Sequence, residues 1–368
     1  MTGAIGGFLP LDPGPPLGAG GRESVARRWF RGLPHHGYRN GRSALALGVG
    51  KALGPFGTLW MTGFACQALA EAAGAMLRLG HARRLAAYPL APEGPLSPDP
   101  RFLAAHLAPG DAVLAVSYFG RPSSAALRRL AGLRQDVTWI EDRAGALWPG
   151  PAWGDALLYS PRKLLGVPDG GYLVITPRGA ARARPLAEQQ PGPSPTESPP
   201  ALRRFEDESG NAAWFPAYRA EEAGMAVAPG APSRLTAALL DRQDFHAIAA
   251  ARRANHAALR PLVPPDLLLE PASDRPAWVP QGLPLQVPDA SALSARMAEA
   301  GVFCPVMWPD PADPGPCARS RALANRVLLL PLDQRYGAEE MRRVASALAA
   351  SIRGAAVSGT GSAAPLAA

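Results

Sequence analysis

Short apolar runs alternate with helical segments between residues 58 and 176. The runs TLWMTGF, DAVLAVSYFG, VTWIED, ALLYS and GYLVIT have the length and composition of buried strands. The intervening ACQALAEAAGAMLRLG, DPRFLAAHL and SSAALRRLAGL are rich in alanine and leucine and repeat apolar residues at helical spacing. This alternation predicts an α/β fold with a mostly parallel sheet covered by helices on both faces.

The pattern also divides the chain. Residues 1–40, rich in Gly and Pro, are expected to form an N-terminal arm, and RSALALGVGKAL begins a large domain over 41–235 with a helix. The Pro- and Ser-rich stretch at 186–201 predicts a mobile loop within that domain. A smaller C-terminal domain is expected over 236–353, followed by a disordered tail over 354–368.

Composition narrows the class of protein. A chain of 368 residues favours two packed lobes over one small module. The net charge of +8 comes from arginines scattered through apolar-patterned segments, so no nucleic-acid partner is predicted. Three widely spaced cysteines without a C-x-x-C pair indicate neither a disulfide framework nor a metal site, and they suit a reducing cytoplasm. No signal-peptide pattern or membrane-spanning apolar stretch is evident.

Lysine is the most informative residue type. The chain has two lysines, Lys51 and Lys163, whereas its other 36 basic residues are arginines. Arginine can replace lysine where only positive charge is needed, but its guanidinium cannot attack a carbonyl as a neutral amine. Lys51 lies in a helical pattern and is expected to be a solvated helix position. Lys163 is therefore the candidate nucleophile.

Two polar residues near Lys163 lie where a ligand of a parallel sheet is expected to bind. Ligands of parallel sheets bind beyond the carboxyl ends of the strands, and Asp142 and Ser160 each close a predicted strand. Farther upstream, TLWMTGF and the helix that follows form a strand-to-helix unit. The N-terminus of such a helix favours an anion such as phosphate.

Residues 137–176 read VTWIEDRAGALWPGPAWGDALLYSPRKLLGVPDGGYLVIT, which places an acidic strand end, a G-D-x-x-x-x-S strand, a lysine and a Gly-Gly pair in that order. This order resembles the DegT/DnrJ/StrS family of fold-type I pyridoxal phosphate enzymes. The resemblance extends to GRSAL at 41–45, YFG at 118–120 and LLLPLDQRY at 328–336. It implies a homodimer that transfers an amino group from glutamate or glutamine to a keto group, which in many members belongs to a nucleotide sugar.

The resemblance assigns roles residue by residue. Lys163 would form the Schiff base with pyridoxal 5'-phosphate and later move the proton at the substrate carbon. Asp142 would hold the pyridine nitrogen in its protonated form. Ser160 would bind the phosphate, and Phe64 and Cys66 of GFACQA would face the cofactor. Gly170 and Gly171 would let the backbone pass close to the site.

The chain also departs from the family pattern. Gly145 stands where a glutamine or histidine commonly follows the aspartate by three residues, and Ser160 precedes Lys163 by three residues where the family often has five. A lyase or desulfurase that uses the same cofactor, or a noncatalytic binding protein, therefore stays open as an alternative.

Single residues also have ordinary structural interpretations. Asp142 could pair with Arg143, Ser160 could cap a strand end, and the Gly-Gly pair could form a turn. A solvated loop is the expected position of His35 and His36. Substrate contact and simple packing both stay open for three residues of the C-terminal part: Trp308, Arg335 and Tyr336.

Overall fold

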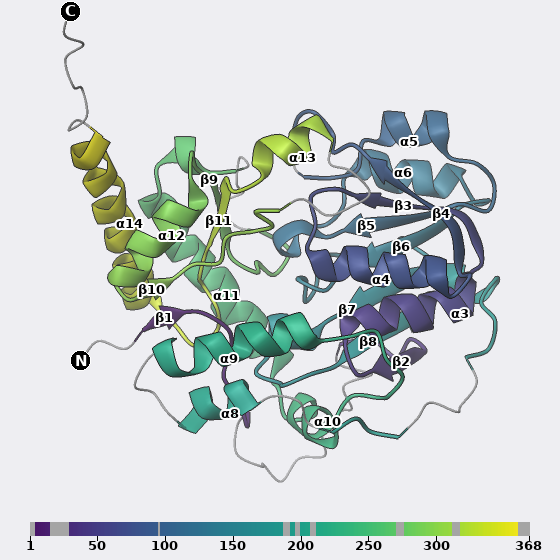
Figure 1. Ribbon diagram of the computed structural model, residues 1–368, viewed down its shortest axis with the longest axis horizontal. Coiled ribbons are helices and arrows are strands. Elements are labelled where there is room, and N and C mark those ends of the chain that lie inside the picture. The colour runs from purple at the N-terminus through teal and green to yellow at the C-terminus, as the bar shows by residue number, and fades with distance from the viewer. Residues whose placement is uncertain are drawn as a thin grey trace, which may run out of the picture.

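A computed structural model describes residues 4–14, 29–94, 96–186, 192–195, 199–206, 211–269, 276–310 and 317–359. Within these ranges the large lobe is built on one seven-stranded sheet, and the smaller lobe holds two short two-stranded sheets. Figure 1 shows the lobes side by side. The strands are β1 (Ile5–Gly6), β2 (His35–Tyr38), β3 (Phe56–Thr62), β4 (Ala82–Tyr88), β5 (Ala112–Val116), β6 (Thr138–Asp142), β7 (Ala156–Tyr159), β8 (Gly171–Ile175), β9 (Leu283–Gln286), β10 (Val302–Phe303) and β11 (Val327–Leu330).

The large sheet has the order β2-β8-β7-β6-β5-β3-β4. Strands β4, β3, β5, β6 and β7 are parallel, while β8 runs antiparallel to β7 and β2 runs antiparallel to β8. The predicted α/β class with a mostly parallel sheet is confirmed. Because the five parallel strands end at one edge of the sheet, the loops that follow them meet there.

Helices cover both faces of this sheet (Figure 1). On one face Leu158 and Leu173 pack with helical residues such as Met76. On the other face the neighbouring residue Leu157 packs toward Phe245. Consecutive strand residues point to opposite faces, so a strand that is apolar throughout can be buried on both sides. This explains why the central strands read as continuous apolar runs.

The helices include several short segments. The predicted helix at RSALALGVGKAL forms with a π-helical centre over Ala44–Val49. The α-helices are α2 (Gly41–Ser43), α3 (Gly50–Leu53), α4 (Gln67–Arg78), α5 (Pro100–His106), α6 (Ala125–Leu133), α7 (Pro177–Ala180), α8 (Pro199–Glu206), α9 (Asn211–Gly224), α10 (Arg234–Leu240), α11 (Phe245–Leu259), α12 (Ala290–Glu299), α13 (Ala318–Leu323) and α14 (Ala338–Gly359), with the π-helix η1 (Ala44–Val49) and 3₁₀ turns η2 (Tyr118–Gly120), η3 (Pro161–Lys163), η4 (Arg260–Leu262) and η5 (Pro265–Leu267).

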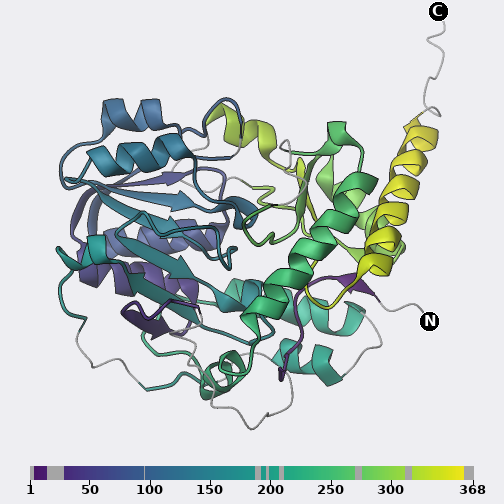
Figure 2. The ribbon, with the colours of Figure 1, turned by 180° about the vertical axis from the view of Figure 1, so that it is seen from behind.

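Helix α11 joins the two lobes. Its first turns pack through Phe245 and Ile248 against the large lobe, whereas Leu259 at its end lies in the core of the small lobe. Figure 2 shows α11 running from the large lobe toward α14. The β9–β11 pair adds Leu285 and Leu328 to that second core. The lobes are thus connected by a continuous packed helix.

The predicted arm contributes a strand to each lobe. Ile5 pairs in parallel with Val302 of β10, and the arm's later residues form β2 of the large sheet. Helix α14 extends to Gly359 and so enters the predicted 354–368 tail, while 360–368 lie outside the described residues. Half of the predicted loop at 186–201 is described, and its end is already helical in α8, whereas 187–191 and 196–198 lie outside the described residues. Within the described ranges, every helix is too short or too polar to cross a membrane.

Candidate active site

The carboxyl ends of β5, β6 and β7 lie side by side. Val116 pairs with Asp142, and Asp142 pairs with Leu158. The chain leaves β7 through Ser160 into the η3 turn, which ends at Lys163. The structure therefore brings the predicted carboxylate and the predicted amine to neighbouring strand ends at one edge of the sheet.

Asp142 is partly buried at this edge. Its Oδ1 accepts a hydrogen bond from the Ala144 N–H at 2.9 Å. Burial raises the pKa of the Asp142 carboxyl above its ordinary value, and the positive charge of Lys163 counteracts that rise. The two side chains are thus close enough to interact electrostatically. The alternative pairing with Arg143 does not form, because the Arg143 guanidinium binds Glu141 at 2.6 Å in a buried ion pair.

The Lys163 side chain is exposed at the end of η3, and its backbone N–H donates to the Ser160 carbonyl at 3.2 Å. Ser160 is buried, and its hydroxyl makes no capping bond to η3. Its Oγ would lie 3.9 Å from a Cβ placed on Gly41, so the start of α2 faces it. Lys51 is exposed in α3, which confirms its expected solvated position.

The predicted strand-to-helix unit is also present, as β3 followed by α4. Cys66 is the N-cap of α4 but makes no side-chain capping bond, and the first turn of α4 contains no acidic residue. The positive end of the α4 helix dipole, formed by the free N–H groups of that turn, is therefore not neutralised by a carboxylate within the turn. Phe64, in contrast, is fully buried and packs edge-on against Trp308 with ring centroids 4.9 Å apart. Its contact with the cofactor stays a prediction.

The Gly-Gly pair allows close backbone packing next to the site. Gly170 has a left-handed φ of +100°, and a Cβ on Gly171 would lie 2.3 Å from the backbone of Asn40. Glycine is required at the first position by conformation and at the second by space. The pair thus joins the start of β8 to the segment that precedes α2.

Two residues absent from the sequence prediction converge on the same edge. A Cβ on Gly145 would lie only 2.4 Å from Oε1 of Gln281, so the Gln281 side chain occupies the space beside the loop after Asp142. Arg252 of α11 is buried and donates to the carbonyl oxygens of Gln281 at 3.0 Å and Leu164 at 3.3 Å. The only sign of this packing in the local sequence was Gly145, which stands where the family commonly has a glutamine or histidine.

A second group of missed residues lies on α9. The Arg162 guanidinium donates to Glu222 at 2.8 Å and to the Tyr218 hydroxyl at 3.1 Å. Burial raises the pKa of the neighbouring Glu221 carboxyl to about 7. Because Arg162 precedes Lys163, these contacts attach α9 to the turn that carries the lysine.

The remaining candidates have structural contacts. His35 and His36 lie on the edge strand β2, which corrects the expected loop position. The Arg335 guanidinium binds Asp333 at 2.7 Å, and the Tyr336 hydroxyl accepts a hydrogen bond from the Gly6 N–H at 2.8 Å. The second of these contacts ties the arm to the small lobe.

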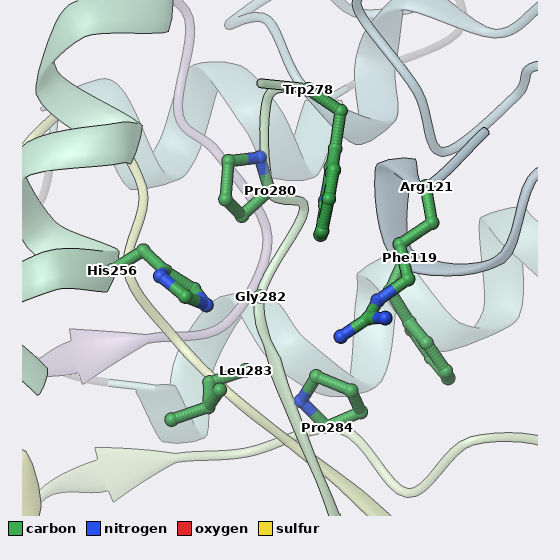
Figure 3. Close-up of a pocket in the computed structure, with 8 residues that line it drawn as sticks. All are labelled: Phe119, Arg121, His256, Trp278, Pro280, Gly282, Leu283 and Pro284. Carbon is green, nitrogen blue, oxygen red and sulfur yellow. The ribbon is translucent and has the colours of Figure 1, made fainter. Parts of the chain in front are cut away.

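A narrow pocket opens between the lobes. Figure 3 shows the Arg121 guanidinium and the His256 imidazole pointing toward each other across it. Trp278 forms one wall, and the Arg121 guanidinium carbon lies 4.9 Å from the centre of its ring. Pro280 and Gly282, the neighbours of Gln281, also line the pocket. The pocket therefore adjoins the segment that reaches Gly145.

Comparison with known proteins separates fold from sequence. No protein-family model and no curated protein matches the chain. Solved structures do match along most of their length. A putative sugar aminotransferase from Streptococcus pneumoniae, in its PMP form, superimposes with a TM-score of 0.65 at 12% identity, covering 97% of this chain and 100% of that one. The chain has the fold of an aminotransferase.

Two further structures have the same architecture. The aminotransferase TlmJ from Streptoalloteichus hindustanus gives a TM-score of 0.63 at 19% identity and covers 90% of this chain and 89% of its own. A DegT DnrJ EryC1 StrS aminotransferase from Brucella abortus gives 0.57 at 17% identity with 87% of each chain covered. The predicted fold class, a large α/β domain with a smaller C-terminal one, is confirmed by this aminotransferase fold.

Proposed function

We propose that this chain is a pyridoxal phosphate-dependent aminotransferase, a divergent relative of the DegT/DnrJ/StrS enzymes, with Lys163 as the cofactor-binding lysine. One observation carries the proposal: Asp142 ends β6, and Lys163 ends the η3 turn that follows the neighbouring strand β7. The aminotransferase fold of the whole chain supports it.

The residues at this edge fit three of the four polar parts of pyridoxal phosphate: the ring nitrogen, the aldehyde and the phosphate. Asp142 keeps Oδ2 without a hydrogen bond among the described residues, so this oxygen can face the ring nitrogen. The exposed Lys163 amine suits the aldehyde carbon. The N-terminus of α4 beside Cys66, together with the Ser160 hydroxyl, suits the phosphate. The chain therefore has a suitable group for each of these three parts.

When bound, pyridoxal phosphate supplies an electron-withdrawing ring that stabilises negative charge at the substrate carbon. Asp142 contributes by keeping a proton on the ring nitrogen, because an ionised carboxylate stabilises the adjacent positive charge. As a free amine, Lys163 would carry the proton between the substrate carbon and the cofactor. The α4 N-terminus would hold the phosphate and so limit the orientations open to the ring.

The acceptor would be a keto group, and the sugar aminotransferases among the structural neighbours support a nucleotide-sugar ketone. Glutamate or glutamine would be the donor. A homodimer is also part of the proposal, because Lys163 is exposed in the single subunit. Helices α8 and α9 expose Leu202, Phe205 and Phe215 at 44%, 50% and 40%, an apolar surface that a second subunit could cover.

The first test compares Lys163→Ala with Lys51→Ala, which removes the other lysine at an exposed helix position. Pyridoxal phosphate is added to each protein, and the visible absorption spectrum is recorded before and after borohydride reduction. We expect a visible band in the wild type and in Lys51→Ala but none in Lys163→Ala. Peptide mass spectrometry should locate the reduced cofactor on Lys163. A band retained by Lys163→Ala would refute the assignment.

Asp142→Asn tests the second residue. Because an amide lacks the charge that stabilises the protonated ring nitrogen, cofactor affinity should fall about 10- to 100-fold. Adding glutamate or glutamine to the loaded wild type then tests amino transfer, since an amino donor should abolish the visible band. A loaded protein that responds to neither donor would contradict transamination with these donors while leaving cofactor binding intact.

A further inference from the structure

Gln281 comes from the segment that leads into β9, yet its side chain reaches the loop after Asp142. A Cβ on Gly145 would lie 2.4 Å from Oε1, 3.0 Å from Cδ and 3.3 Å from Nε2 of Gln281. The φ of Gly145 lies outside the left-handed region that favours glycine. Space, and not backbone conformation, therefore accounts for glycine at this position, and the Gln281 carboxamide fills that space.

The backbone of Gln281 is held from two sides. Its N–H donates to the Phe119 carbonyl at 3.0 Å, in the η2 turn that follows β5. Its carbonyl accepts from the Arg252 guanidinium at 3.0 Å, and the same guanidinium donates to Leu164, the residue after Lys163. The position of Gln281 is thus fixed relative to two of the strand ends that form the proposed cofactor site.

Close packing reinforces this arrangement. Gly120 has a φ of +89°, and a Cβ there would lie 2.3 Å from the carbonyl oxygen of Val279. The two backbones approach as closely as glycine allows. The backbone of Gln281 is therefore anchored, so only its side-chain torsions remain to be fixed when the carboxamide makes a new contact.

The carboxamide itself has spare hydrogen-bonding capacity. It is partly exposed, and it makes no hydrogen bond to any described residue. A carboxamide has two N–H donors and an acceptor oxygen. Such a group, placed beside the loop that follows Asp142 and without a hydrogen-bond partner among the described residues, is suited to bind a ligand at this edge of the sheet.

We propose that the Gln281 carboxamide is a further cofactor-binding group and donates a hydrogen bond to the phenolic ring oxygen of pyridoxal phosphate. The inference rests on the proposed function. Asp142 is assigned to the ring nitrogen, Lys163 to the aldehyde carbon and the α4 N-terminus to the phosphate on the opposite edge. The phenolic oxygen, between the nitrogen and the aldehyde carbon, is the remaining polar atom of the ring and needs a donor.

Gln281→Met tests the proposal, since methionine has nearly the same length and fills the space without an amide. The matched control is Gln135→Met, at an exposed position beyond α6 where the side chain donates to the Gly132 carbonyl. Pyridoxal phosphate is titrated into each protein. We expect about tenfold weaker binding for Gln281→Met and unchanged binding for the control. The pH midpoint of the visible absorption change should rise, because the lost donor stabilised the ionised ring oxygen.

A relocated amide gives a second test. Gly145→Gln combined with Gln281→Ala supplies the carboxamide from the other side of the same space, and it should recover most of the lost affinity. Wild-type affinity in Gln281→Met would overturn the inference and leave the proposed function standing. A lower unfolding temperature of Gln281→Met without a change of pH midpoint would also overturn it, by assigning Gln281 to packing. No binding by the wild type would overturn both proposals.

Discussion

Arg252 offers a sharp test of how the two lobes are held together. Its guanidinium is buried at 1% exposure and donates to Oε1 of Gln334 at 2.9 Å, to the Pro280 carbonyl at 3.3 Å and to the Gln281 carbonyl at 3.0 Å. It also donates to Leu164. We predict that Arg252→Met, which keeps an unbranched apolar stem but removes the guanidinium, destabilises the protein.

Two opposing effects set the size of the loss. Burial lowers the pKa of Arg252 to about 10, so the cation carries a desolvation cost of roughly 3 kcal/mol that methionine removes. Three acceptors, the Pro280 and Gln281 carbonyls and the Gln334 amide, lose this donor, at about 1–3 kcal/mol each. The Leu164 carbonyl retains the Gln334 N–H at 3.0 Å. The expected net loss in free energy of unfolding is about 3 kcal/mol.

Urea denaturation followed by fluorescence measures the loss. The control is Arg253→Met on the same helix, because that guanidinium is partly exposed and donates to the Trp278 and Ala277 carbonyls. Water can replace its contacts, so a loss below about 1 kcal/mol is expected there. Equal losses in the two variants would refute the reasoning, since burial would then make no difference.

Two further variants test electrostatic contributions. Because the pKa of Glu221 is raised to about 7, its protonated form stabilises the fold at low pH, and this contribution is lost as pH rises from about 4.5 through 7. Glu221→Gln should flatten the stability profile by about 1–2 kcal/mol across that range, measured by urea denaturation at each pH, and an unchanged slope would contradict the assignment. Asp155 is fully buried, accepts from the Trp139 N–H at 2.7 Å and pairs with Arg178, so Asp155→Asn should cost about 3 kcal/mol. Asp136→Asn, in an exposed pair, should cost under about 1 kcal/mol by the same denaturation assay, and similar losses would argue against burial as the cause.

The sequence by itself determined the architecture of the large lobe. Strand and helix signals depend on residues a few positions apart, so apolar runs such as DAVLAVSYFG and the helical spacing after Cys66 could be read locally. Their alternation predicts parallel strands, and parallel strands end at one edge. The neighbouring positions of Asp142 and the Lys163 turn therefore follow from residue order alone. The chemical contrast between two lysines and many arginines singled out Lys163.

Tertiary structure alone decided which distant segments complete this edge. Gln281 fills the space beside Gly145, and Arg252 binds the carbonyl next to Lys163, although these residues belong to separate parts of the chain. The arm supplies β1 and β2, although its Gly- and Pro-rich sequence has no strand periodicity, because pairing partners in both lobes accept its backbone hydrogen bonds. Contacts between residues far apart in sequence depend on how complete elements pack, and no local pattern encodes them.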